Sequence, residues 1–266
     1  MSQLLVTTVQ ADLVWEDKAA NLEQLEAAIS GIPGARELVV LPEMFSTGFS
    51  MAPEKLAEPM DGPTVGWMRA IAARYHIILT GSLIIAEEGR FYNRLIWMLP
   101  TGQMGYYDKR HLFAFAGEDR FYTPGNRRFI ASVKGWRVLV QVCYDLRFPV
   151  WARQQTQADK PEYDLLVYVA NWPERRIHAW KTLLTARAIE NQCYVVGVNR
   201  VGLDGHGINH SGSTMVVDPM GETCYHCEHI PDTHTLQLDK AYLEEVRGRL
   251  PFLRDADAFT ILNHSI

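Results

Sequence analysis

The chain has 266 residues, of which 47% are hydrophobic and 21% charged, the composition of a globular protein with a substantial core. Its net charge of -5 lacks the basic surplus expected for binding nucleic acid or an anionic membrane, and no apolar run reaches the roughly 18–20 residues that span a bilayer. Four cysteines without a secretory signal do not form a disulfide framework, so we expect reduced thiols and a cytoplasmic location.

Short aliphatic runs alternate with helical periodicity along the chain. Runs rich in Val, Ile, Leu and Tyr predict strands at Leu4–Gln10, Glu37–Leu41, Ile77–Ile85, Arg94–Leu99, Arg137–Val142, Leu165–Ala170 and Tyr194–Val198. Apolar residues at helical spacing predict helices at Asn21–Ser30, Thr64–Tyr75 and His178–Asn191. This alternation indicates an α/β protein whose strands lie between helical layers.

Nothing in the composition divides the chain into separate domains. Turn signals at 87–89, 100–102 and 218–221 predict hairpins between neighbouring strands. We find no linker, low-complexity segment or fixed-period repeat, so we expect one domain over residues 1–266. Residues 250–266 have few periodic signals and form a predicted C-terminal tail that packs across another surface, such as that of a partner subunit.

The first candidate for chemistry is Glu43, in the segment VVLPEMF. The aliphatic residues predict a buried strand that Pro42 ends, so Glu43 emerges at its end beside Met44 and Phe45. A carboxylate in apolar surroundings is costly to ionise, which suits it to act as a general base. The alternative is an ordinary surface glutamate that follows a strand.

The second candidate is Lys109, in the segment YYDKRHLF after a hairpin turn. Alternating aromatic and charged residues predict a strand that leaves the sheet with Lys109 on one face. A lysine held in a cleft is a point charge with three donors, suited to stabilising an oxyanion. The alternative is a salt-bridged strand lysine. His111 could be the base of a Cys/His pair, although a structural role is the more common fate of a single histidine.

The third candidate is Cys143, which directly follows the predicted strand Arg137–Val142, with a helix expected to begin near 148–150. A nucleophile on a strand-to-helix turn is exposed at the sheet edge beside free backbone N–H groups. Because the thiolate is the reacting species, the site must favour negative charge, and Lys109 and those amides meet this need. The alternative is a buried core cysteine.

The order Glu–Lys–Cys, in the settings LPEMF, YDKRHLF and VCYDLRFP, resembles the nitrilase superfamily of carbon–nitrogen hydrolases. The resemblance continues through GEDRFYTPG, VANWP, TARAIENQCYVVGVNRVG and DPMGE, and therefore covers nearly the whole chain. Within the superfamily, this set is most similar to the bacterial omega-amidases, which hydrolyse the distal amide of 2-oxoglutaramate and 2-oxosuccinamate.

The resemblance implies a four-layer α-β-β-α sandwich completed across a dimer, and hence a homodimer, with no cofactor and no metal. It implies that Glu43 is the base, Lys109 the electrophilic stabiliser and Cys143 the nucleophile. Glu118, in GEDRF, matches a second glutamate that orients the lysine and assists proton handling in the family.

The reaction expected from these roles is amide hydrolysis through a thioester. Cys143 attacks the amide carbon as Glu43 takes the thiol proton, and Lys109 and the backbone N–H of Tyr144 hold the oxyanion. Ammonia leaves and water hydrolyses the thioester. We therefore predict an amidase that acts on the terminal amide of a short 2-oxo dicarboxylic acid monoamide. The alternatives are a nitrilase, a carbamoylase, another short-chain amidase and a non-catalytic scaffold.

Such a substrate also needs its distal carboxylate recognised, by arginine or by fixed hydrogen-bond donors. The candidates are Arg147, four residues past the nucleophile, and Asn171 and Trp172 at the end of the next strand. Phe113 and Tyr107 are candidate walls of the pocket.

Two of these residues also have structural interpretations. Arg147 could form an ion pair with Asp145 or Glu118, and we favour that interpretation slightly. Trp172 could belong to the core.

The segment TCYHCEH is a further alternative, because Cys224 and Cys227 with nearby histidines are typical of a metal or redox site. However, there is no second cysteine pair. The segment follows a hairpin turn, so we expect a strand in which the two thiols point to opposite faces. We therefore predict no metal at this position.

Overall fold

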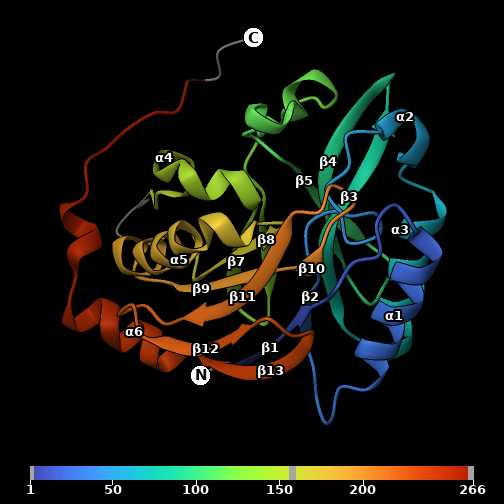
Figure 1. The fold of residues 1–266 in the computed structure, drawn as a ribbon. Coiled ribbons are helices and arrows are strands. Elements are labelled where there is room, and N and C mark those ends of the chain that lie inside the picture. Colours follow the sequence, from blue (N-terminus) through green and yellow to red (C-terminus); the bar gives the residue numbers. More distant parts are fainter. Residues whose placement is uncertain (1–2, 156–159, 263–266) are drawn as a thin grey trace.

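The computed structural model describes residues 3–155 and 160–262, and has two β-sheets packed face to face between helices (Figure 1). The first sheet has the strand order β13-β1-β2-β3-β4-β5, and the second has β10-β11-β9-β8-β7-β6, with β12 beside β11. The strands of the first sheet are β1 (Gln3–Gln10), β2 (Leu38–Val40), β3 (Ile78–Glu87), β4 (Arg90–Met98), β5 (Met104–Asp108) and β13 (Asp232–Asp239). Those of the second are β6 (Ile130–Val133), β7 (Trp136–Val142), β8 (Leu165–Ala170), β9 (Tyr194–Asn199), β10 (Val201–Leu203), β11 (Asn209–Val217) and β12 (Thr223–Glu228).

Helices cover the sheets and connect the strands. The α-helices are α1 (Lys18–Ser30), α2 (Pro53–Leu56), α3 (Pro63–Tyr75), α4 (Pro149–Ala152), α5 (Ile177–Asn191) and α6 (Lys240–Arg249). The short 3-10 helices are η1 (Ala114–Ala116), η2 (Glu118–Arg120), η3 (Cys143–Arg147), η4 (Glu174–Arg176) and η5 (Phe252–Asp255). None of the helices within the described residues has the length and apolar character that crossing a membrane requires.

The helices and sheets form four layers, as Figure 1 shows. Helices α1 and α3 lie on the outer face of the first sheet, where Leu25 and Met68 enter one apolar cluster. Helix α5 lies on the outer face of the second sheet, where Leu184 is buried. Between the sheets, Val40 of β2 and Val140 of β7 belong to a third cluster. Each sheet is thus buried on both faces, as near-continuous aliphatic strands require.

The predicted four-layer α-β-β-α sandwich is confirmed. All four layers come from one chain, so the expectation that a dimer completes the sandwich is corrected. One chain suffices because α1 and α3 follow strands of the first sheet and α5 connects two strands of the second.

Parallel strands bring the ends of β2, β7 and β8 to one region. Strand β2 pairs in parallel with β1 and β3, and β8 pairs in parallel with β7 and β9. Parallel strands share the edge where their carboxyl ends lie, which is where open α/β sheets commonly bind ligands. Glu43, Cys143 and Asn171 all follow such strand ends closely.

The predicted strands and helices are all present, with boundaries shifted by a few residues. The largest shift is at Arg94–Leu99, which is in fact β4 (Arg90–Met98). Glu88 and Gly89 have φ angles of 51° and 72°, the left-handed pair of a tight hairpin turn, so pairing begins immediately at Glu87 and Arg90. Strand β13 and helix α6, where polar residues hide the periodicity, were not predicted.

Asp164 forms ion pairs that link α6 to the second sheet. Its buried carboxylate, at the start of β8, accepts hydrogen bonds from Arg137 Nη2 (2.9 Å), Lys240 Nζ (3.1 Å) and Arg247 Nη1 (2.8 Å). Burial alone would raise the pKa of Asp164, but Arg137 and Arg247 outweigh burial and lower it to about 2. The ionised form therefore stabilises the fold.

We predict that Asp164→Asn lowers the free energy of unfolding at pH 7 by about 2 kcal/mol, because the fold holds the pKa of Asp164 at about 2, below the ordinary aspartate value. Because the folded pKa is depressed, this stability is present above the ordinary aspartate pKa and is lost as the pH falls through about 2. Urea titrations between pH 7 and pH 3 should show the difference from wild type shrinking with acidity. An equal loss for Asp61→Asn, an exposed control, would contradict this account.

Candidate active site

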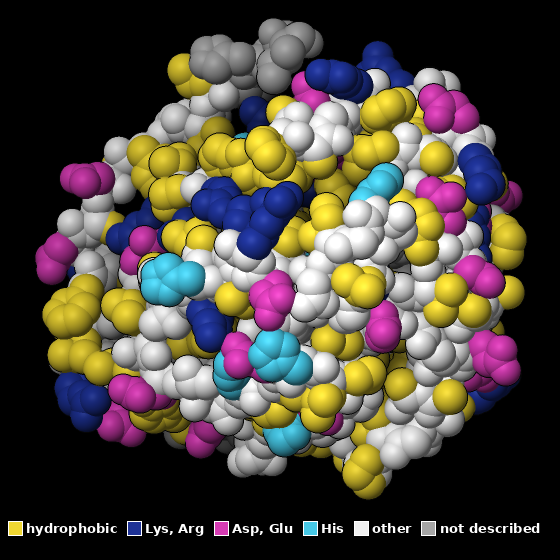
Figure 2. Space-filling view, viewed as in Figure 1, with side chains coloured by type: hydrophobic (Ala, Val, Ile, Leu, Met, Phe, Trp, Pro, Cys, Tyr) yellow, Lys and Arg dark blue, Asp and Glu magenta, His cyan; other side chains and the backbone are white. Residues whose placement is uncertain are grey.

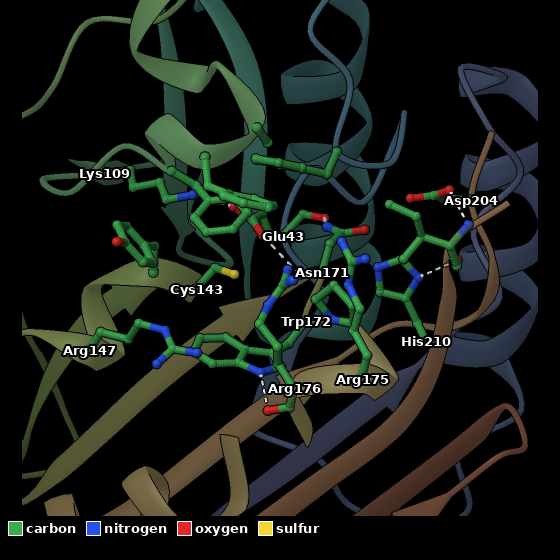
Figure 3. Close-up of a pocket in the computed structure, with 17 residues that line it drawn as sticks. Glu43, Lys109, Cys143, Arg147, Asn171, Trp172, Arg175, Arg176, Asp204 and His210 are labelled. Atoms are coloured by element: carbon green, nitrogen blue, oxygen red, sulfur yellow. Dashed lines mark hydrogen bonds and ion pairs between the residues drawn. The ribbon is translucent and has the colours of Figure 1, made fainter. Parts of the chain in front are cut away.

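A cavity of about 220 Å³ lies at the shared strand ends (Figure 3). Its lining includes Glu43, Lys109 and Cys143, which come from three distant parts of the chain. Drug-sized ligands occupy pockets of roughly 300–1,000 Å³. The cavity therefore fits a small substrate rather than a polymer.

Lys109 is the central cation of the site. Its ammonium is fully buried and donates hydrogen bonds to Glu43 Oε1 (2.9 Å) and to Glu118 Oε1 (3.0 Å) and Oε2 (2.9 Å). Burial alone would lower the pKa of Lys109, but the charges of Glu118 and Glu43 outweigh burial and raise it. The lysine therefore stays protonated and acts as a fixed positive charge.

The surroundings of Glu43 are more polar than the sequence suggested. Although Met44 and Phe45 are fully buried beside it, the carboxylate accepts hydrogen bonds from Lys109 Nζ, from Asn93 Nδ2 (2.8 Å) and from the backbone N–H of Asn171 (2.8 Å). Asn171 Nδ2 also donates to the Glu43 carbonyl (2.6 Å). These bonds fix the orientation of the carboxylate without closing it off from the cavity that it lines.

Glu118 lies behind the lysine and does not line the cavity. Its carboxylate accepts bonds from Lys109, from Asn93 Nδ2 (3.2 Å) and from the backbone N–H of Phe113. Burial raises the pKa of Glu118, and the charge of Glu43 adds to this effect while Lys109 opposes it. The geometry assigns Glu118 to holding Lys109 in place.

Cys143 lies on a strained turn at the end of β7. Its φ of 44° is in the left-handed region that only a few non-glycine residues adopt. The turn is held by Asp145, whose Oδ2 accepts the Val142 N–H (3.0 Å) and whose Oδ1 accepts the His111 N–H (2.9 Å). At the predicted strand-to-helix turn, β7 is followed first by the 3-10 helix η3 and then by α4.

The thiol of Cys143 is protonated in the resting site. Burial and the negative charge of Glu43 raise the pKa of Cys143 well above its ordinary value, and Lys109 counteracts them only in part. A base must therefore remove the proton when the sulfur attacks. Glu43, whose carboxylate lines the same cavity, is the candidate for this base.

Most predicted substrate contacts line the cavity: Phe113, Arg147, Asn171 and Trp172. Tyr144, whose backbone N–H is the predicted oxyanion donor, lines it as well. Tyr107 does not, and this prediction is corrected. Its ring is buried between the sheets, and its hydroxyl donates to Asp145 Oδ2 (2.8 Å), because the inward face of β5 points into the core. Tyr107 instead supports the cysteine turn.

Two structural interpretations are also resolved. Arg147 pairs with neither Asp145 nor Glu118; its guanidinium lies 4.9 Å from the centre of the Trp172 ring. His111 Nδ1 lies 2.8 Å from Asp145 Oδ1, and its ring stacks on Phe148 at 3.8 Å. His111 therefore shares the carboxylate that holds the turn.

Several residues of the site are not predicted by the sequence patterns. Asn93, in the middle of β4, bridges the two glutamates, and Arg175, Arg176 and His210 line the cavity. The pair Arg175–Arg176, one residue beyond VANWP, was the available signal for the two arginines. Asn93 and His210 lie inside strands, and their sequence neighbours give no such signal.

The Cys224–Cys227 segment forms β12, away from the cavity. Cys224 is exposed and Cys227 partly buried. Across residues 3–155 and 160–262, no three His, Cys, Asp or Glu side chains gather in an arrangement that could hold a metal ion.

The sequence model of the carbon-nitrogen hydrolase family matches residues 5–248. The chain belongs to this family. The carbon–nitrogen hydrolase is therefore an enzyme of the nitrilase superfamily that acts on C–N bonds, and the predicted family is confirmed.

Two curated relatives match this chain over nearly its whole length. It is 43% identical to omega-amidase YafV of Escherichia coli over 98% of this chain and 100% of that protein. It is 28% identical to 2-oxoglutaramate amidase of Bacillus subtilis over 94% of this chain and 96% of that protein.

Solved structures agree with the fold. A CN-hydrolase superfamily protein of Xanthomonas campestris, 44% identical, has a TM-score of 0.95 over 98% of this chain and 100% of its own; that crystal carries an arsenic adduct in the active site. Saccharomyces cerevisiae Nit3, a nitrilase superfamily member 25% identical, has a TM-score of 0.82 over 94% of each chain.

We predict that Lys109→Met lowers the free energy of unfolding at pH 7 by about 3–5 kcal/mol, because two buried carboxylates lose their shared cation. The deficit should shrink as the pH falls, because without the opposing charge of Lys109 burial raises the pKa of Glu118 further and favours its neutral form. Lys134→Met is the matched control, since Lys134 pairs with Glu37 at the surface and such pairs contribute at most about 1 kcal/mol. Equal losses for the two variants would show that Lys109 is not a buried ionic centre.

Proposed function

We propose that the chain is an omega-amidase that hydrolyses the terminal amide of a short 2-oxo dicarboxylic acid monoamide, such as 2-oxoglutaramate or 2-oxosuccinamate. The observation that carries the proposal is the convergence of Glu43, Lys109 and Cys143 on one small cavity. The names of the most similar relatives support the choice of substrate.

In the acylation step, Sγ of Cys143 attacks the amide carbon and Glu43 takes the thiol proton. The carbonyl π electrons move to oxygen. Lys109 has three N–H groups. One donates to Glu43 and one is shared by the two oxygens of Glu118, which leaves the third for the oxyanion. The backbone N–H of Tyr144, in the first turn of η3, is the second proposed donor.

The tetrahedral intermediate then collapses to the thioester. Glu43 gives its proton to the amide nitrogen, the C–N bond breaks and ammonia leaves. In deacylation, Glu43 takes a proton from water, whose oxygen attacks the thioester carbon. The C–S bond breaks, the proton returns to sulfur, and the acid leaves. Glu118 acts throughout by holding Lys109.

We predict that Cys143→Ala lowers kcat for 2-oxoglutaramate by at least about 10⁴-fold, since removal of a nucleophile abolishes the covalent route. Circular dichroism should show that the variant folds. Ammonia release at the wild-type rate would end the covalent mechanism. Mass spectrometry of rapidly quenched wild type should detect an acyl group on the Cys143 peptide.

The choice of substrate needs its own assay. Wild type should hydrolyse 2-oxoglutaramate with a higher kcat/KM than glutamine, simple nitriles or N-carbamoyl amino acids. A preference for nitriles would favour a nitrilase, and a preference for carbamoyl substrates would favour a carbamoylase. No turnover of any of these compounds would favour a non-catalytic scaffold.

We also propose that the protein works as a cytoplasmic homodimer with one domain over residues 1–266. A thiol nucleophile suits a reducing compartment. Val150 of α4, Ile189 of α5 and Phe252 of η5 expose large apolar side chains that a partner subunit could cover, and η5 belongs to the tail 250–266. Residues 1–2, 156–159 and 263–266 lie outside the described residues. Light scattering of the purified chain tests the assembly.

A further inference from the structure

Two half-buried arginines of the cavity lack, within the described residues, the counter-charges that the buried arginines have. Arg94, Arg187 and Arg200 each have a carboxylate partner within 4.0 Å. Arg147 and Arg176 line the cavity, and neither has such a partner among the residues that the structure describes. Partly buried cations without a counter-charge are costly, so an anionic ligand is the expected complement.

Aromatic rings hold these two guanidinium groups in fixed positions. The Cζ atom of Arg147 lies 4.9 Å from the centre of the Trp172 ring, and that of Arg176 lies 5.2 Å from the centre of the Phe113 ring. A guanidinium stacked by its face keeps its N–H edge available, and this edge matches the two oxygens of a carboxylate. Figure 3 shows both side chains at the same cavity as Cys143.

The two cations are also close enough to act on one another. Burial lowers the pKa of Arg176, and the positive charges of Arg175 and Arg147 lower it further, while Cys143 opposes them. The carboxylate of a ligand would relieve this repulsion.

We propose that Arg147 and Arg176 together bind the carboxylate at the far end of the substrate from the scissile amide. This inference rests on the proposed function and names its specificity determinants. Asp204 and His210 lie across the cavity. Burial and the charge of Arg200 lower the pKa of His210 to about 4, so His210 is neutral at pH 7. Because Glu43 and Glu118 already balance the charge of Lys109, Arg147 and Arg176 are the half-buried cations left to attract the carboxylate, and binding there orients the substrate with its amide toward Cys143.

The first test is kinetic. Arg176→Met and Arg147→Met should each lower kcat/KM for 2-oxoglutaramate by at least about 30-fold, mainly by raising KM. This is the cost of removing one partner of a buried charge pair. Both should change kcat/KM for valeramide, a neutral amide without the carboxylate, by less than about three-fold. Arg127→Met, which removes an exposed arginine, should leave both values within about two-fold of wild type.

The second test does not require turnover. 2-Oxoglutarate should protect the Cys143 peptide from alkylation by iodoacetamide in wild type. Each arginine variant should weaken protection at least about ten-fold while its unprotected alkylation rate stays within about two-fold of wild type.

Unchanged KM and unchanged protection in both variants would overturn the inference. If wild type fails to hydrolyse 2-oxoglutaramate, the proposed function fails. The protection experiment then still decides whether the arginine pair binds a carboxylate.

Discussion

The site depends on one buried ammonium held between two buried carboxylates. Moving such ions out of water costs several kcal/mol each, and only close, well-directed pairing offsets this. Lys109 follows β5, Glu43 follows β2 and Glu118 begins η2, so the ion cluster fixes three segments relative to each other. Asn93 bridges the two carboxylates and prevents their repulsion from separating them. In the proposed mechanism, Glu43 and Lys109 of this ion cluster also take part in the reaction.

The second sheet supplies the nucleophile to this cluster. Its parallel strands end where those of the first sheet end, and Cys143 and Asn171 follow two of them. Asp145 holds the strained turn by accepting bonds from Val142, His111 and Tyr107, and so links the cysteine to β5, which precedes the lysine. A thiol kept protonated by burial and by Glu43 does not react until the base removes its proton. The fold thereby couples nucleophile and base.

Site residues that stand directly after an aliphatic run could be predicted from the sequence. Glu43 and Cys143 are of this kind, because strand ends place side chains at a sheet edge. The sequence could not predict Asn93, which lies within β4. The role of Asn93 depends on which face of the sheet its side chain occupies. Tyr107 was misplaced for the same reason: β5 turns that ring into the core. The slightly favoured ion pair of Arg147 with Asp145 or Glu118 is absent, and the oxygens of Asp145 accept bonds from Tyr107 and His111 instead.

The most direct test of the account is the pH dependence of Cys143 alkylation in wild type and Glu43→Gln, measured beside amide hydrolysis. Glu43 raises the pKa of the thiol, and in the proposed mechanism it also accepts the thiol proton. The variant should therefore have a more acidic thiol, alkylated at lower pH than in wild type, and yet lose hydrolysis. A variant whose thiol is no more acidic, or one that still hydrolyses the amide at the wild-type rate, would contradict the account.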